Sequence, residues 1–394
     1  MSILFFDPAD SRKTLLPLTY TRPIAEMRVG ILKISEKWCL RLDQSHFGYD
    51  TENYLEGAFP KIDTDFQTLW INATILPSDE LVEAIQTLGS HEALVQKEVM
   101  FAFKGESRDA IINKKTFDGQ FDSVQYPWDI FLQNGREIIR DYALVTSGRN
   151  SQPITDPHTK TYGENIFIEE GASIKASILN AENGPIYIGK NAEVMEGSII
   201  RGPFSLGEGA SLRMGSKIRG DCTVGPYSKV GGEVSNSVVF GNSNKAHDGY
   251  LGNSVLGEWC NLGAGTNNSN LKNNYEPVKM WDYQSHQFEK TGLQFCGLIM
   301  GDHTKAGINS MFNTGTTVGV CANIFGGGLP SQMIPSFAWG GARGFMTYEF
   351  QKAIDTIKKV MGRRDIEMTE EEIKILQHVF DNTAAIRSWQ KQHK

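Results

Sequence analysis

Long apolar runs are missing from this chain. No window approaches 18 consecutive apolar residues, and the opening MSILFFDPADSRK lacks a charged segment followed by a long apolar one. A membrane-spanning helix or a secretory leader requires those features. We therefore expect a cytoplasmic protein with no membrane insertion.

Basic residues and regularly spaced cysteines are also scarce. Lysine and arginine number 39 against 46 acidic residues, so the net charge is -7 and there is no sign of a basic stripe. Nucleic acid is therefore not an expected partner, although local arginines can still bind small anionic ligands. The five cysteines are odd in number and show no CxxC spacing, so we expect reduced thiols.

The chain is rich, by contrast, in a six-residue repeat. Every sixth position is aliphatic over a long central stretch, and a small side chain lies two residues before most of these positions. Such a fixed period is typical of a solenoid built from hexapeptide units. The series comprises Ile188, Val194, Ile200, Leu206, Leu212, Ile218, Val224 and Val230; it slips by two to Val238, Asn244, Tyr250, Leu256 and Leu262; and it returns as Met300, Ala306, Phe312, Val318 and Ile324.

The repeat predicts stacked coils, because six residues cannot bury an aliphatic side chain alone. An amphipathic helix is excluded, since its 3.6-residue period would not keep a constant step of six. The pattern resembles the left-handed parallel β-helix of acyltransferases and nucleotidyltransferases, in which successive coils pair as parallel strands about 4.8 Å apart. The left hand is implied by this resemblance. We expect the β-helix over residues 161–345, with an inserted loop at 267–295.

The segments before the repeat have a different pattern. Residues 1–125 mix strand-like and helix-like runs, including a helix capped by Ser78, and predict an α/β domain. Residues 126–160 predict a connecting helix and a linker. The expected buried side of this helix comprises Ile130, Phe131, Ile138 and Ile139.

The segment after the repeat, residues 346–394, has a helical pattern. Its second helix begins at a capping box formed by Thr369 and Glu372. An open strand ladder invites association, so these helices are placed to close the open end of the β-helix.

The stretch EVSNSVVFGNSNKAHDGYLG, followed by CNLGAGTNNSN, resembles the acetyltransferase half of the bifunctional N-acetylglucosamine-1-phosphate uridyltransferase/glucosamine-1-phosphate acetyltransferase family. In that family the matching positions are a catalytic histidine (His247), a sugar-contacting tyrosine and asparagine (Tyr250 and Asn261), and a residue whose backbone faces the acetyl thioester (Ala264). Allowing a two-residue deletion, Arg219 matches an arginine that binds the sugar phosphate. The family lysine and tyrosine are replaced by Ser235 and Leu271, which affects the identity of the substrate.

The matched residues suit acetyl transfer to an amine. A neutral imidazole, here His247, titrates in the range needed to accept a proton from the attacking nitrogen. Gly263 and Gly265 leave the backbone bare for the thioester, and Asn270 and Lys305 are further candidate contacts of acetyl-CoA. The alternative is a histidine that is simply solvated or hydrogen-bonded at a turn. His303 is a weaker candidate, for which a surface turn residue is the preferred interpretation.

The N-terminal stretch LLPLTYTRPIAEMRVG resembles the opening of a sugar-phosphate nucleotidyltransferase. Leu16, Thr19 and Arg22 fall on the family pattern. The phosphate-cradling glycines are absent, since FFDPADSRKT occupies their place, and Ile24 replaces the family lysine. Such glycines let backbone amides approach a triphosphate. Without them, the backbone of this segment is not expected to cradle a triphosphate in that way.

Two other arginines enter the nucleotide-site hypothesis. Arg12 and Arg28 could partly replace the missing glycines, although a solvated surface role is the preferred interpretation for each. No metal ligands can be assigned from the sequence.

Together these resemblances imply an enzyme that transfers acetyl from acetyl-CoA to glucosamine 1-phosphate, coupled to uridylyl transfer if the first domain uses UTP and Mg2+. They imply a homotrimer, because the family's acetyl site lies between neighbouring β-helices. Two alternatives stay open. One is a nucleotidyltransferase with a purely structural β-helix, and the other is a non-catalytic protein that binds sugar nucleotides.

Overall fold

The first domain is built on a six-stranded sheet in the order β2-β1-β3-β6-β5-β7. Strands β2 and β3 run parallel to β1, whereas β6 runs antiparallel to β3. The computed structural model describes residues 2–389. The strands are β1 Ile3–Phe6, β2 Phe47–Asp50, β3 Leu69–Asn72, β5 Glu92–Gln96, β6 Val99–Lys104 and β7 Asn113–Thr116, and a separate pair joins β4 Ile75–Leu76 to β8 Asp122–Ser123.

Short helices surround this sheet. Ser78 caps its helix as predicted, because its hydroxyl accepts a hydrogen bond from the Leu81 N–H at 3.2 Å. The helices are α1 Ala9–Thr14, α2 Ile34–Leu42 and α3 Asp79–Gln86, with 3-10 turns at Ile24–Glu26, Asn53–Leu55 and Arg108–Ala110.

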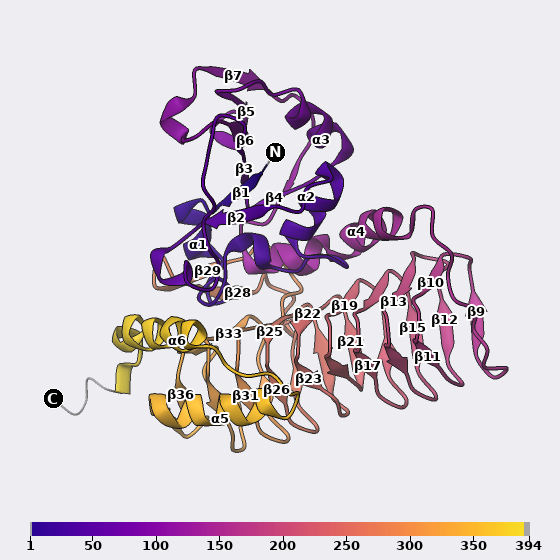
Figure 1. The fold of residues 1–394 in the computed structure, drawn as a ribbon. Coiled ribbons are helices and arrows are strands. Elements are labelled where there is room, and N and C mark those ends of the chain that lie inside the picture. Colours follow the sequence, from indigo (N-terminus) through magenta and orange to yellow (C-terminus); the bar gives the residue numbers. More distant parts are fainter. Residues whose placement is uncertain (1, 390–394) are drawn as a thin grey trace.

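The central part of the chain winds into a parallel β-helix with three faces, which confirms the predicted architecture of an α/β domain joined to a β-helix (Figure 1). The first face contains β10 Ile166–Ile168, β13 Ile186–Ile188, β16 Phe204–Leu206, β19 Cys222–Val224, β22 Val238–Gly241, β25 Val255–Glu258, β30 Leu298–Met300, β33 Thr316–Val318 and β35 Met333–Ile334.

The second face contains β11 Ser173–Ile174, β14 Glu193–Val194, β17 Ser211–Leu212, β20 Lys229–Val230, β23 Asn244–Lys245, β26 Asn261–Leu262, β31 Lys305–Ala306, β34 Asn323–Ile324, β36 Ala338–Gly341 and β37 Gly344–Thr347. The third face contains β9 Lys160–Tyr162, β12 Ile178–Asn180, β15 Ile199–Arg201, β18 Lys217–Ile218, β21 Glu233–Ser235 and β24 Tyr250–Gly252, and the pair β27 Asn267–Asn268 with β32 Met311–Phe312 follows β24.

The predicted register is correct up to Val230 and is then one residue early over the coil that contains β22, β23 and β24. The aliphatics from Ile188 to Val230 line one buried core. Beyond them the inward residues are Val239, Lys245 and Leu251, each one position later than predicted. The chain takes a short turn at Gly231 and Gly232, the latter with φ of 74°. Val224 therefore pairs with Val239 rather than Val238.

The displaced Val238 is buried on the outside of the β-helix, in the core that belongs to the first domain. The adjacent residues Val238 and Val239 are thus buried in two different cores. Periodicity alone could not reveal this, because either valine satisfies a hydrophobic repeat.

The connecting helix α4, Pro127–Thr146, lies between the first domain and the β-helix, where it contacts β19, β22 and β25 (Figure 1). Ile130, Phe131 and Ile138 are buried as predicted, but the prediction for Ile139 is wrong, since it is 48% exposed.

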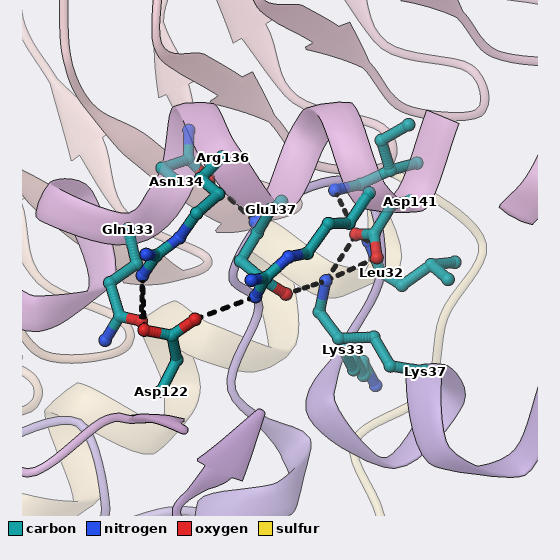
Figure 2. Close-up of polar contacts among 12 residues, drawn as sticks. Leu32, Lys33, Lys37, Asp122, Gln133, Asn134, Arg136, Glu137 and Asp141 are labelled. Atoms are coloured by element: carbon teal, nitrogen blue, oxygen red, sulfur yellow. Dashed lines mark hydrogen bonds and ion pairs between the residues drawn. The ribbon is translucent and has the colours of Figure 1, made fainter. Parts of the chain in front are cut away.

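The stripe that α4 buries is partly polar. Lys37 Nζ lies 2.9 Å from Glu137 Oε2 and 2.5 Å from Asp141 Oδ1, and all three side chains are almost fully buried. Asp141 also accepts hydrogen bonds from the backbone N–H groups of Ile31 and Leu32 (Figure 2). Buried charges are tolerated when paired and hydrogen-bonded in this way, so the cluster fixes the first domain on α4.

The insertion in the β-helix begins later than predicted. Asn267 and Asn268 form β27, which pairs with β32 of the next coil. The hairpin of β28 Lys279–Asp282 and β29 Gln287–Lys290 then follows, and part of it packs into the core of the first domain through Val278 and Met280.

Two helices follow the β-helix, α5 Phe350–Gly362 and α6 Glu370–Asn382, with a 3-10 turn at Ala384–Ile386. The predicted capping box is confirmed, because the Thr369 hydroxyl accepts from Glu372 N–H and Glu372 accepts from Thr369 N–H. Helix α5 lies beside the second face rather than across the open end, and α6 lies between the β-helix and the first domain (Figure 1). Residues 390–394 lie outside the described residues.

No helix within residues 2–389 is both long enough and apolar enough to cross a membrane.

Candidate functional site

His247 follows β23 at the corner between the second and third faces. Its side chain is exposed and contributes to a cavity of about 720 Å³. The opposite wall of this cavity comes from α5 and the turn after it. The imidazole is therefore not packed inside the β-helix, and it lines this cavity.

The His247 cavity is strongly cationic. Four of its lining residues are lysine or arginine, and the described lining contains no aspartate or glutamate. Such a site attracts anions. The cations are Lys229, Lys305, Arg363 and Arg364.

Arg364 is held in place by the β-helix. Its guanidinium donates to the Tyr227 carbonyl at 2.7 Å and to Asn242 Oδ1 at 3.0 Å, and it lies 5.4 Å from the centre of the Trp259 ring. Lys305 Nζ donates to the carbonyls of Trp259 and His303 at 2.7 and 2.9 Å. Burial lowers the pKa of Lys305.

A second lysine lies directly behind His247. Lys245 occupies an inward position of the β-helix and is 2% exposed. Its Nζ donates to the carbonyls of Gly231 and His247 at 2.9 and 2.8 Å. Burial lowers the pKa of Lys245 to about 8. The lysine therefore fixes the backbone of His247, a role that the hexad pattern missed because it placed Asn244 inward.

The turn from Gly263 to Gly265 forms one edge of the cavity. A Cβ on Gly263 would lie 2.5 Å from the Gly307 carbonyl carbon, and Gly265 has φ of 70°. Gly263 is thus required by close packing against the next coil, and Gly265 by its left-handed backbone conformation. Ala264 lies between them and lines the cavity, and its backbone N–H makes no hydrogen bond within residues 2–389.

The predicted sugar-phosphate residues are divided between two faces. Asn261 lines the His247 cavity. Tyr250 and Arg219 lie on the third face, where the Tyr250 hydroxyl accepts from Asn270 Nδ2 at 2.9 Å and Arg219 pairs with Glu233 at 3.1 Å. The predicted set therefore lies on two faces of the β-helix that meet at a corner.

The predicted nucleotide residues are engaged inside the first domain. Arg12 is 6% exposed, pairs with Asp7 at 2.7 Å and donates to the carbonyl of Arg22 at 3.2 Å. Thr19 donates back to the Arg12 carbonyl at 2.7 Å. Leu16 lies nearby in the same short segment. The residues in the place of the phosphate loop thus bond to one another.

The two remaining arginines hold the first domain on the β-helix. Arg28 is 7% exposed and donates to the Phe240 carbonyl at 3.2 Å. Arg22 pairs with Glu258 at 3.1 Å and with Asp302. A solvated role for Arg12 and Arg28 is therefore wrong. No group of three or more potential metal ligands exists among the described side chains.

His303 lies in a turn as predicted, but it is half-buried rather than at the surface. Its ring runs parallel to the Trp259 ring at 6.4 Å, and its Nδ1 is shielded from solvent. Burial, reinforced by the charge of Lys305, lowers the pKa of His303 to about 3.

Known proteins resemble parts of this chain. Residues 3–150 match the family model of sugar nucleotidyl transferases. The bifunctional protein GlmU of Methanocaldococcus jannaschii is 38% identical over 87 residues, which cover 22% of this chain and 21% of the relative. Part of the chain is thus similar to part of a GlmU protein. The bifunctional sugar-1-phosphate nucleotidylyltransferase/acetyltransferase of Sulfurisphaera tokodaii is 34% identical over 148 residues, 37% of this chain and 36% of the relative.

These matches span only about a fifth to a third of the length of the relatives. Among solved structures, the polysialic acid acetyltransferase NeuO covers 49% of this chain and 83% of its own, with 14% identity and a TM-score of 0.27. A TM-score this low supports no inference about function.

Proposed function

We propose that this protein is a cytoplasmic enzyme that transfers acetyl from acetyl-CoA to the amino group of glucosamine 1-phosphate. The observation that carries the proposal is an exposed imidazole in a cavity lined by four cations and no carboxylate. Both substrates carry phosphate groups, and charge-assisted hydrogen bonds to phosphate are strong. The relatives whose names include acetyl transfer support the same reaction.

His247 acts as the general base. The sugar nitrogen attacks the thioester carbonyl, a C–N bond forms, and the C–S bond breaks. The proton leaves the nitrogen for His247 and is passed to the departing thiolate of coenzyme A. The unpaired N–H of Ala264 stabilises the oxyanion that forms on the way.

Different residues of the cavity bind the two substrates. Arg363, Arg364, Lys229 and Lys305 hold the phosphates of the coenzyme, while Asn261 contacts the sugar. Arg219, Tyr250 and Asn270 lie on the other face of the corner, so a neighbouring copy would present them to this cavity. A homotrimer completes three such sites, and its mass in solution can be measured by light scattering.

The deciding experiment follows release of free thiol from acetyl-CoA and glucosamine 1-phosphate. We expect His247→Ala to lower kcat by about 100-fold or more, in the range of general-base catalysis. His158→Ala, an exposed histidine far along the β-helix, serves as the matched control. Equal rates for wild type and His247→Ala would remove His247 from the mechanism.

A second candidate is uridylyl transfer by the first domain, favoured by the family match of residues 3–150. Against it, the segment that should cradle a triphosphate is occupied by the ion pair of Arg12 with Asp7. Pyrophosphate release from UTP and N-acetylglucosamine 1-phosphate that persists in His247→Ala would establish this activity.

A further inference from the structure

A second cavity, of about 410 Å³, lies between the first domain, the β-helix and helix α6. Its walls include Arg22 and Phe59 of the first domain and Glu258, Trp259 and His303 of the β-helix. This volume lies within the usual range for small-molecule sites, which commonly form between domains. The proposed acetyl transfer uses none of these residues as a substrate contact.

Two polar atoms at this cavity lack partners. His303 Nδ1 and Arg22 Nε are both shielded from solvent and have no hydrogen bond within the described part of the chain. Arg22 is 5% exposed, and its terminal nitrogens are already engaged by Glu258 and Asp302. An unsatisfied buried polar atom is costly, and its presence calls for an explanation such as a ligand.

The charge of the cavity limits what can bind there. Its described lining contains five carboxylates, Glu26, Glu258, Asp302, Glu371 and Glu372, against two cations, Arg22 and Lys33. The low pKa of His303 keeps its imidazole neutral at physiological pH. A phosphate would be repelled here, whereas hydroxyl groups can donate to the carboxylates.

The aromatic residues complete the chemical description. Trp259 and Phe59 both line the cavity, and aromatic rings offer apolar surface to the C–H groups of a ring-shaped ligand. Carboxylates, a neutral imidazole and aromatic rings together suit a ligand that is rich in hydroxyl groups and has no charge.

We propose that this interdomain cavity binds an uncharged sugar ring, whose hydroxyl groups donate to Glu258 and its neighbouring carboxylates while His303 supplies a further polar contact. The site is separate from the His247 cavity, and its ligand lacks the phosphate that the cationic cavity requires. Binding there joins the first domain to the β-helix.

The test uses the full chain with N-acetylglucosamine as the probe. Nitrogen-15 labelling of the histidines lets the His303 ring be followed by NMR and identified by its loss in His303→Phe. We expect saturable shifts of the His303 ring nitrogens in wild type and in His247→Ala. N-acetylglucosamine 1-phosphate should bind this site more weakly.

Two further variants decide the matter. Glu258→Gln keeps the shape of a partly exposed side chain but removes its charge, and we expect it to weaken binding at least about tenfold, or 1.4 kcal/mol. Glu276→Gln, an exposed carboxylate in the insertion, should leave binding unchanged. Absent His303 shifts, unchanged affinity in Glu258→Gln, or tighter binding of the phosphorylated sugar would each overturn the proposal. Loss of acetyl transfer in His247→Ala leaves this result untouched, so the two proposals fail separately.

Discussion

The two cavities of this protein share a wall and have opposite charge. Trp259 lines both. Arg364 lies over its indole ring, and the His303 ring runs parallel to it. The charged residues that line the His247 cavity are all lysine or arginine, whereas the cavity between the domains contains an excess of carboxylates. A net charge of -7 predicts neither, because ligand choice depends on local charge in a cleft with a low dielectric constant.

The largest expected effect comes from weakening the contact between the first domain and the β-helix, on which only the cavity between the domains depends. Lys37→Met leaves Asp141 buried without its cation, while Glu137 keeps its pair with Arg140. This change should cost about 3 to 5 kcal/mol of unfolding free energy. Urea unfolding monitored by circular dichroism measures this loss. Lys352→Met, which breaks an exposed pair with Glu349, should cost less than about 1 kcal/mol. Sugar binding between the domains should weaken in Lys37→Met well before acetyl transfer does.

The next effect concerns the lysine behind His247. Because burial lowers the pKa of Lys245 from 10.5 to about 8, its protonated form costs stability, and the native state releases that proton before the unfolded state does. Wild-type stability should therefore rise as pH increases from about 8 toward 10.5. Lys245→Met should remove this pH dependence and raise the free energy of unfolding by about 1 to 3 kcal/mol at pH 7.

The same variant should lower kcat, since the His247 carbonyl loses the donor that fixes it. A stabilised variant with unchanged kcat would show that Lys245 does not position His247.

A smaller effect tests the cationic cavity. Arg364→Gln should raise KM for acetyl-CoA about tenfold while kcat changes little, since a phosphate contact made equally in ground and transition states is removed. Lys358→Gln, at an exposed position of α5, is the control and should behave as wild type. An unchanged KM in Arg364→Gln would place the coenzyme elsewhere.

The last prediction is that pH has no effect on the binding of N-acetylglucosamine. With the pKa of His303 lowered to about 3, binding of N-acetylglucosamine should be constant between pH 5 and 8, about two units above that pKa at the lower limit. Isothermal titration at the two ends of this range provides the check. A loss of affinity near pH 6.5 would show that His303 gains a proton in the native protein.

The hexads made the β-helix predictable because one aliphatic side chain per unit must enter a narrow core. The candidate residues of the KAHDGYLG and NLGAGT stretches followed from resemblance, and the structure brings His247, Asn261 and Ala264 to one cavity. The separation of Arg219 and Tyr250 from that cavity could not be predicted from the sequence, since neighbouring positions along a coil can lie on different faces.

Other residues were misjudged because their partners lie far away in the sequence. Arg28 has its acceptor in β22, Arg22 pairs with Asp302, and His303 is covered by Trp259. Arg363 and Arg364 were missed altogether, since the helical pattern of α5 gave no sign of which strands it would cover.

By itself the sequence determined the repeating coil, the flanking helices and the corner that carries His247, because these depend on short periods and local turn chemistry. Tertiary structure alone decided the charge of each cavity and the inward position of Lys245. The physical reason is that charge and burial are set by neighbours from other coils and from other domains, and no local pattern encodes those distances.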